Sequence, residues 1–145
     1  MNWQPYAGVI SVSICTVLLY YAFLVRLMVV KISLYREHAA RGEDFDRYLS
    51  RNPRLHAADR AHLNMLEHLP TFNLVLWLNA WVVSPSSAAA GGTVWLLARA
   101  AYPFLVGSTL GRDVPVRVLF ATFTGYAAVA YLAGSVAVRI LQRAM

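Results

Sequence analysis

Long apolar runs separated by short polar segments dominate the chain and predict four helices that cross a membrane. The runs lie at about residues 6–30, 61–83, 88–110 and 114–140. Each has about the 20 residues that a helix needs to cross the hydrocarbon core of a bilayer. None alternates strictly between apolar and polar residues, so helices are favoured over the strands of a membrane barrel. The expected fold class is an all-α integral membrane protein, with residues 1–145 forming one four-helix domain.

The polar segments between these runs predict the orientation in the membrane. Residues 31–60 hold seven of the thirteen Lys and Arg and five of the seven acidic residues. Because positively charged loops stay in the cytoplasm, residues 31–60 are expected to form a cytoplasmic loop, with both termini outside. The segment "GRDVP" (residues 111–115) then returns the chain to the cytoplasm. Arg139 and Arg143 lie on the outer side in this topology and run against the rule.

Composition narrows the class of protein further. Only 14% of the residues are charged, against about a quarter in soluble domains, which argues against a soluble enzyme. The net charge of +6 does not indicate a nucleic-acid partner, because most of the charged residues lie in a loop of mixed sign beside the membrane. Cys15 is the single cysteine, which excludes an intramolecular disulfide. No two histidines have the spacing of a zinc helix together with a third ligand, so no metal is expected.

Apart from Arg139 at the outer end of the last run, four charged residues fall inside the predicted spans: Arg26, Glu67, Arg99 and Arg117. In the predicted topology all four lie in the cytoplasmic half of the membrane. A charge inside a bilayer is costly unless it is paired or hydrated, and it marks a functional site by default. These four residues are therefore the first candidates for a site.

Helical spacing extends this set along the second run. Arg60, Asn64, Glu67 and Thr71 lie at i, i+4, i+7 and i+11, which places them in a narrow stripe on one helix face. Such a stripe has to face protein, water or a polar ligand rather than lipid.

Structural interpretations of the same residues stay open at this point. Glu67 can neutralise Arg99 or Arg117 and hold the helices in register. Arg26 can extend its guanidinium to the membrane interface. His62 and His68 point away from the stripe and are expected to be packing residues. A small transporter or channel subunit also contains charges within the membrane, but it requires a polar path across the whole bilayer.

The stretch "RAHLNMLE" (residues 60–67) closely resembles the second-helix signature of the MAPEG family, the membrane-associated proteins of eicosanoid and glutathione metabolism. The rest of the chain is similar to this family as well. It has four spans, a basic first loop, an arginine within the third span in "LARAAY" (residues 97–102), and a Pro-x-Arg in "VPVR" (residues 114–117).

The resemblance implies a homotrimer of four-helix subunits, with a glutathione site at the subunit interface that opens toward the cytoplasm. By match to the family motif, Arg117 takes the catalytic place that holds the glutathione thiolate. The residues in glutathione-binding places are Arg60, Asn64, Glu67, Arg99 and Tyr102. Glutathione carries two carboxylates and an ammonium, which suits an arginine-rich site with one glutamate.

Two departures bear on the activity that the resemblance implies. Tyr102 stands where some family members have a histidine, and Ala121 stands where some synthases have a tyrosine. These differences argue against a specific prostaglandin or leukotriene synthase. A glutathione transferase or peroxidase that acts on lipophilic electrophiles or lipid hydroperoxides is the expected function. A non-enzymatic lipid-binding or scaffold member of the family is the alternative.

The expected location is a bacterial inner membrane, because arginine is used far more than lysine and the chain is small. In a eukaryote the equivalent location is the endoplasmic reticulum.

Overall fold

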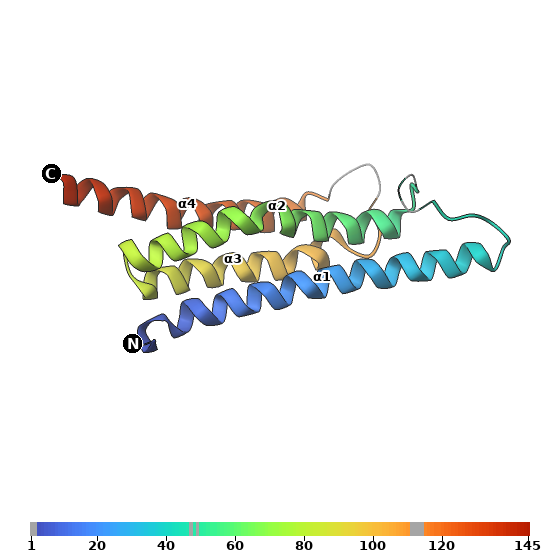
Figure 1. Ribbon diagram of the computed structural model, residues 1–145. Helices are drawn as coiled ribbons and strands as arrows, with labels where there is room; N and C mark the ends of the chain where they lie inside the picture. Colours follow the sequence, from blue (N-terminus) through green and yellow to red (C-terminus); the bar gives the residue numbers. More distant parts are fainter. Residues whose placement is uncertain (1–2, 47, 49, 111–114) are drawn as a thin grey trace.

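A computed structural model describes all residues except 1–2, 47, 49 and 111–114. In the described part of the chain, four long α-helices form an elongated bundle (Figure 1). After a short 3₁₀ turn, the helices are α1 (Ala7–Ala39), α2 (Pro53–Val82), α3 (Pro85–Val106) and α4 (Arg117–Ala144). The expectation of an all-helical, four-helix chain is confirmed.

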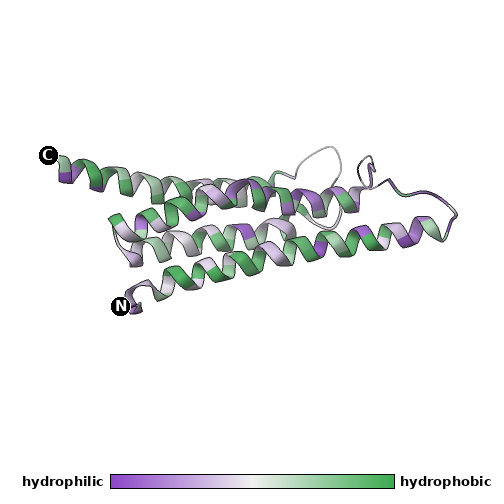
Figure 2. Ribbon diagram, in the orientation of Figure 1, coloured by the Kyte–Doolittle hydropathy of each residue, from purple (hydrophilic) through white to green (hydrophobic). Residues whose placement is uncertain are grey.

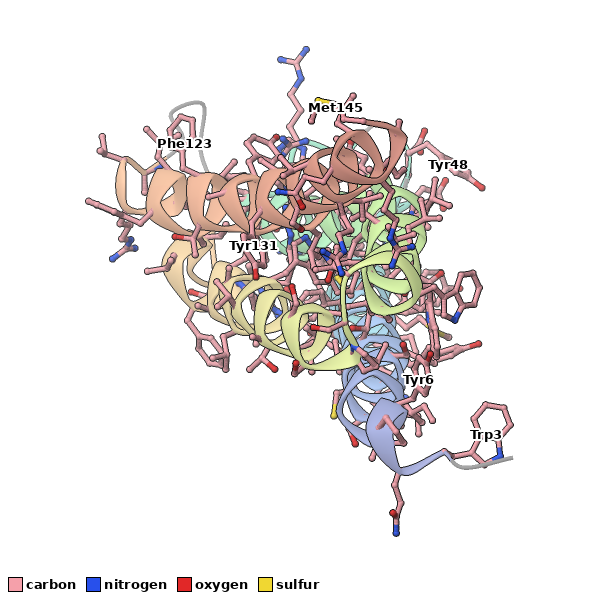
Figure 3. All side chains as sticks on the ribbon, turned by 90° about the vertical axis from the view of Figure 1, so that its left-hand side faces the viewer. Trp3, Tyr6, Tyr48, Phe123, Tyr131 and Met145 are labelled. Atoms are coloured by element: carbon pink, nitrogen blue, oxygen red, sulfur yellow. The ribbon has the colours of Figure 1, made fainter. Side chains whose placement is uncertain are left out.

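The helices run alternately up and down, so the two termini lie at the same end of the bundle (Figure 1). Viewed along the bundle, α2 and α3 lie between α1 and α4 (Figure 3). The central pair α2 and α3 therefore contacts every other helix, and residues on these two helices can meet partners from both sides.

Helices α1 and α2 extend well into the segment that was predicted as a loop. Glu37, in the last turns of α1, accepts a hydrogen bond of 2.8 Å from Nη1 of Arg54 at the start of α2. The start of α2 is set by Asn52, whose side chain accepts from the backbone N–H of Arg54 at 2.9 Å, and by Pro53 in the first helical position. Hydropathy marks where a helix leaves lipid, whereas these polar contacts let both helices continue beyond that point.

The connection between α3 and α4 is longer than predicted. Helix α3 ends at Val106 rather than near residue 110, and α4 begins at Arg117 rather than near residue 114. Residues 111–114 of the predicted "GRDVP" link lie outside the described residues.

By length and composition, three helices of the described chain are apolar enough to cross a membrane. They are the segment Gln4–Ala39, which includes α1, together with α3 and α4. Helix α2, the predicted second span, is not among them. Figure 2 shows the reason, because hydrophilic residues are frequent in the half of α2 near its start.

The core of the bundle is built around a stacked aromatic pair. The rings of Phe72 on α2 and Trp95 on α3 lie parallel, with centroids 3.7 Å apart, and neither side chain is accessible to solvent. Residues of all four helices join this cluster, among them Val12 of α1 and Leu132 of α4. Because lipid is as apolar as these side chains, tight packing rather than water exclusion stabilises this contact.

We expect Trp95→Ala to lower the free energy of unfolding by about 3–5 kcal/mol, because it opens a cavity between the two central helices. Trp81→Ala removes the same side chain from α2, at a position that is 66% exposed. This control should change the unfolding temperature in detergent far less. Equal losses for both variants would show that the aromatic stack is not the centre of the core.

Candidate functional site

The stripe of polar residues on α2 lies at the boundary between the inside and the outside of the bundle. Asn64 is 4% exposed, whereas the side chains of Arg60 and Glu67 are 48% and 53% exposed. At about 100° per residue the stripe covers roughly 60° of the helix circumference, with Asn64 at one edge and Glu67 at the other. The stripe therefore presents one residue to the core and the others to the surface.

Arg99 on α3 is the partner of Asn64 inside the bundle. Its guanidinium donates from Nη1 to Oδ1 of Asn64, and the side chain is 1% exposed. The guanidinium carbon lies 5.4 Å from the centre of the Trp95 ring, so a cation–π contact supports the charge from another side.

Gly125 on α4 makes room for this buried cation. A Cβ atom at Gly125 would lie 2.9 Å from Nη2 of Arg99 and 3.2 Å from its guanidinium carbon. Only a residue without a side chain lets α4 approach Arg99 this closely. Gly125 is therefore a packing position for the guanidinium of Arg99.

The charge of Arg99 is not neutralised within the described chain. Its Nε and Nη2 are buried and have no hydrogen-bond partner there. Among the described residues, Glu67 forms an ion pair with neither Arg99 nor Arg117; its closest cationic atom is Nη1 of Arg60, at 4.0 Å. The interpretation that Glu67 holds the helices in register by an ion pair with Arg99 or Arg117 therefore does not hold within the described chain.

Arg117, the predicted thiolate-holding residue, lies in the first turn of α4 and contacts the end of α3. Its Nε donates to the backbone carbonyl of Leu105 at 2.8 Å. Arg26 of α1 makes a similar contact at the same end, with Nη2 donating to the carbonyl of Gly107 at 3.1 Å. Cations are favourable at a helix C-terminus, where the last carbonyls lack intrahelical partners. The two arginines thus cap α3 from opposite sides.

Tyr102 lies in the interior, where the start of α2 and the start of α4 meet α3. It is 3% exposed and packs in a cluster with Ala57 and Ala61 of α2 and with Val118 and Ala121 of α4. The small side chain of Ala121 is thus part of the wall that surrounds Tyr102.

Both His62 and His68 of α2 make packing contacts, as predicted. The ring of His62 lies 5.5 Å from that of Tyr20 on α1, and the ring of His68 lies 5.2 Å from that of Tyr126 on α4. Within the described residues no group of three His, Cys, Asp or Glu side chains gathers in a way that could hold a metal ion.

The predicted site residues therefore fall into two sets within the described chain. Asn64, Arg99 and Tyr102 are buried between α2, α3 and α4. Arg60, Glu67 and Arg117 lie on the surface, with Arg60 and Arg117 toward the end of the bundle where α2 begins and α3 ends, and with Glu67 near the middle of α2. Sequence reasoning did not identify the contact of Arg26 with α3. In the sequence, Arg26 is recognisable only as an arginine near the end of an apolar run. That position equally fits a side chain that extends to the membrane interface.

A comparison with models of protein families identifies the family to which the chain is similar. The model of the MAPEG family matches residues 9–138, which include most of all four helices. A search of curated proteins finds none that matches the chain.

Two glycines of α4 offer a matched test of the close approach to Arg99. We expect Gly125→Ala to lower the free energy of unfolding by about 1–3 kcal/mol, because the guanidinium has to move away from Asn64. At Gly134 an added Cβ has nothing within 4 Å. Gly134→Ala should therefore be neutral, or stabilising by up to about 1 kcal/mol through its helix propensity. Thermal unfolding in detergent checks this, and equal shifts for the two variants would contradict the assigned packing.

Proposed function

Because the chain belongs to the MAPEG family, we propose that it is a glutathione-dependent membrane enzyme, a transferase or peroxidase that acts on lipophilic substrates. The observation that supports this most directly is the buried guanidinium of Arg99, which has a neutral amide as its only hydrogen-bond partner in the described chain. A buried cation without a counter-ion, in a bundle half whose surface also carries Arg60 and Arg117, makes this half attractive to an anionic ligand.

Glutathione has the charges that this region would complement. In the proposed complex Arg60 binds a carboxylate, Glu67 binds the ammonium group, and Asn64 donates from its side-chain amide. Arg99 holds the oxygen of that amide, which leaves the nitrogen to face the ligand. Tyr102 stands behind Arg99 as the wall of the site.

We propose that a second and a third copy of the chain complete the site. Glu67 and its neighbours Leu63 and Leu66 are exposed on α2, in the half of the helix that enters the predicted span. A half-exposed carboxylate facing lipid is costly, and a partner subunit removes that cost by covering it. The homotrimer expected for the family places this face of α2 at a subunit interface.

The proposed reaction uses the sulfur of the ligand rather than a protein nucleophile. The thiol of glutathione loses its proton to solvent, and the guanidinium of Arg117 stabilises the resulting thiolate. Because Nε of Arg117 is bound to the carbonyl of Leu105, its two Nη groups are the donors left for the sulfur. An unperturbed thiol has a pKa of about 8.5, so a neighbouring permanent cation increases the thiolate fraction at neutral pH.

Two outcomes of thiolate attack fit this arrangement. With an electrophilic lipophile, a sulfur–carbon bond forms and the leaving group departs with its electron pair. With a lipid hydroperoxide, the sulfur takes the distal oxygen, the oxygen–oxygen bond breaks, and the lipid leaves as an alcohol after protonation. A second glutathione then displaces water from the oxidised sulfur and forms the disulfide.

A lipid-binding or scaffold protein without catalysis is the second candidate. The observation that favours it is the position of Arg117, whose guanidinium caps α3 and so has a structural role independent of any ligand. In either case we place the site on the cytoplasmic side of an integral, multi-pass membrane protein, in the bacterial inner membrane, with both termini outside.

Ultraviolet difference absorbance during titration with glutathione tests the role of Arg117. At pH 7 the wild-type protein should give a saturable thiolate band. Arg117→Ala should give that band only as the pH rises toward about 8.5, the value of the free thiol. Arg143→Ala removes an exposed arginine from the last turn of α4 and should behave as wild type. If Arg117→Ala instead disassembles the oligomer, the arginine is structural; if wild type gives no band, the scaffold is favoured.

Glu67→Gln tests the binding of the ammonium group of glutathione. The substitution keeps the shape of the side chain and removes its charge, so glutathione affinity should fall by about tenfold, as for loss of one charge-assisted hydrogen bond. Glu43→Gln, at an exposed position after α1, serves as the control. Isothermal titration calorimetry measures both, and unchanged affinity in Glu67→Gln would remove this residue from the site.

A further inference from the structure

A groove between α1 and α3 lies apart from the proposed glutathione site. It consists of two adjoining cavities of 570 Å³ and 400 Å³, each within the usual range for a small-molecule site. The two cavities share Leu19, Ala22 and Ala100, so they form one continuous channel along the bundle. From Cys15 to Arg26 the channel follows α1 for about 16 Å, at 1.5 Å per residue.

The walls of the groove are apolar except at one end. Small side chains form its floor, and large exposed ones such as Leu97 and Phe104 stand at its rim. At the far end lie Arg26, Gly107 and Ser108. The groove therefore has the shape of an acyl-chain site with a polar group at one end only.

The guanidinium of Arg26 is held in place but has free donors. Its Nη2 donates to the carbonyl of Gly107, directly after the last residue of α3. Within the described chain its other N–H groups have no partner. Because α3 crosses the membrane and ends at Val106, Arg26 lies at the depth where lipid headgroups begin.

The charge around this end of the groove is positive. Nη2 of Arg117 lies 3.8 Å from the position that a Cβ atom on Gly107 would take, so a second guanidinium is close by. No carboxylate is found among the described residues that line the two cavities. A ligand with net negative charge is therefore favoured over a zwitterionic one.

We propose that this groove binds a phospholipid with a net negative headgroup, with its phosphate on Arg26 and one acyl chain in the channel. Basic pockets between membrane helices at the cytoplasmic border are suited to anionic headgroups. The fork of an arginine matches two phosphate oxygens at once. The second acyl chain stays in the bilayer, because the groove is open to lipid along its length.

Lipid binding in this groove does not require the proposed function, although Arg117 lies near both sites. Ala100 and Phe104 lie on a different face of α3 from Arg99 and Tyr102, which are buried against α2 and α4. Occupation of the groove requires no glutathione, and it holds for an enzyme and for a scaffold alike.

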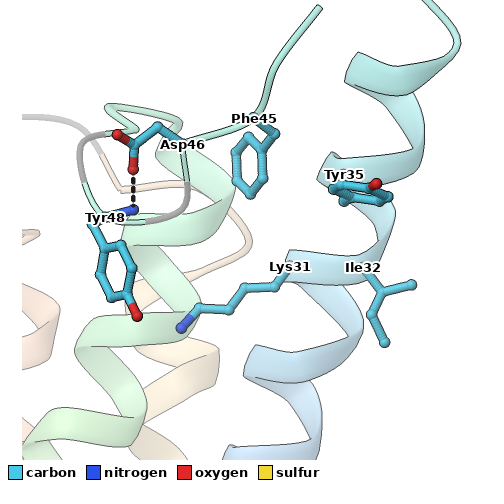
Figure 4. Close-up of a pocket in the computed structure, with 6 residues that line it drawn as sticks. All are labelled: Lys31, Ile32, Tyr35, Phe45, Asp46 and Tyr48. Carbon is cyan, nitrogen blue, oxygen red and sulfur yellow. Dashed lines mark hydrogen bonds between the residues drawn. The ribbon is translucent and has the colours of Figure 1, made fainter.

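Lys31 provides a matched control for the charge of Arg26. It lies five residues further along α1, on another face, and lines a separate cavity of 510 Å³ together with Tyr35 and Phe45 (Figure 4). Like Arg26 it carries one positive charge on the same helix, and within the described chain it forms no ion pair.

The test uses purified, delipidated protein in detergent, mixed with equal amounts of phosphatidylglycerol and phosphatidylcholine that have the same acyl chains. Native mass spectrometry of the intact protein counts the bound lipid. We expect phosphatidylglycerol to be retained about fivefold over phosphatidylcholine, the factor that one basic residue near an anionic headgroup supplies. Arg26→Gln should abolish this preference, Arg26→Lys should keep most of it, and Lys31→Gln should leave it unchanged.

Blocking the channel separates the acyl chain from the headgroup. Ala100→Phe fills the point that both cavities share and should reduce the binding of both lipids, whereas Ala127→Phe, at an exposed position of α4, should not. Three results would overturn the proposal: equal retention of the two lipids, an unchanged preference in Arg26→Gln, or displacement of phosphatidylglycerol by a fatty acid such as hexadecanoate. The last would make a single-chain carboxylate the occupant.

Discussion

The arrangement of the bundle depends on one constraint, a guanidinium enclosed between three helices. Arg99 is buried with one neutral acceptor, Asn64, and the face of one aromatic ring. A buried charge is costly in an apolar interior unless each of its contacts is in place. This constraint explains the glycine at position 125, because α4 can pack this closely against the guanidinium only at a residue without a side chain. The same constraint explains the burial of Asn64, because one residue of the polar stripe on α2 has to face the core to accept a hydrogen bond from Arg99.

This constraint explains why α2 differs from the other helices. A helix that supplies an amide to a buried arginine and two charges to the surface cannot be uniformly apolar. Helix α2 therefore falls short of the composition of a membrane helix, although it lies in the centre of the bundle beside α3. Its other half, which contributes Phe72 and Leu76 to the core, is apolar in the ordinary way. The polar half is the part of α2 that carries the residues of the proposed site.

The number and type of the helices were predictable from the sequence, and their ends were not. An apolar run predicts only the part of a helix that contacts lipid. Helices α1 and α2 continue beyond that part, because Asn52, Pro53 and the Glu37–Arg54 pair stabilise their polar ends. For the site, spacing identified the stripe on α2 as a unit. It could not show that Asn64 is buried while Glu67 is exposed, because that depends on how α2 is rotated against α3 and α4. The role of Arg26 was beyond sequence reasoning, since its partner is a backbone carbonyl 81 residues away.

The end of α3 connects the two surfaces of the molecule that carry proposals. Its last carbonyls are unsatisfied by the helix itself, and two arginines from different helices bind them: Arg117 from α4 and Arg26 from α1. Each arginine donates one hydrogen bond to this helix end and has further N–H groups that a ligand could use. In the two proposals, Arg117 binds the thiolate and Arg26 binds the lipid phosphate. An anion bound to either one reduces the positive charge at this helix end, and thereby weakens the attraction for an anion at the other. Through this shared helix end, a lipid bound in the proposed groove and a thiolate bound in the proposed site would weaken each other's binding by charge alone, without any change in helix packing.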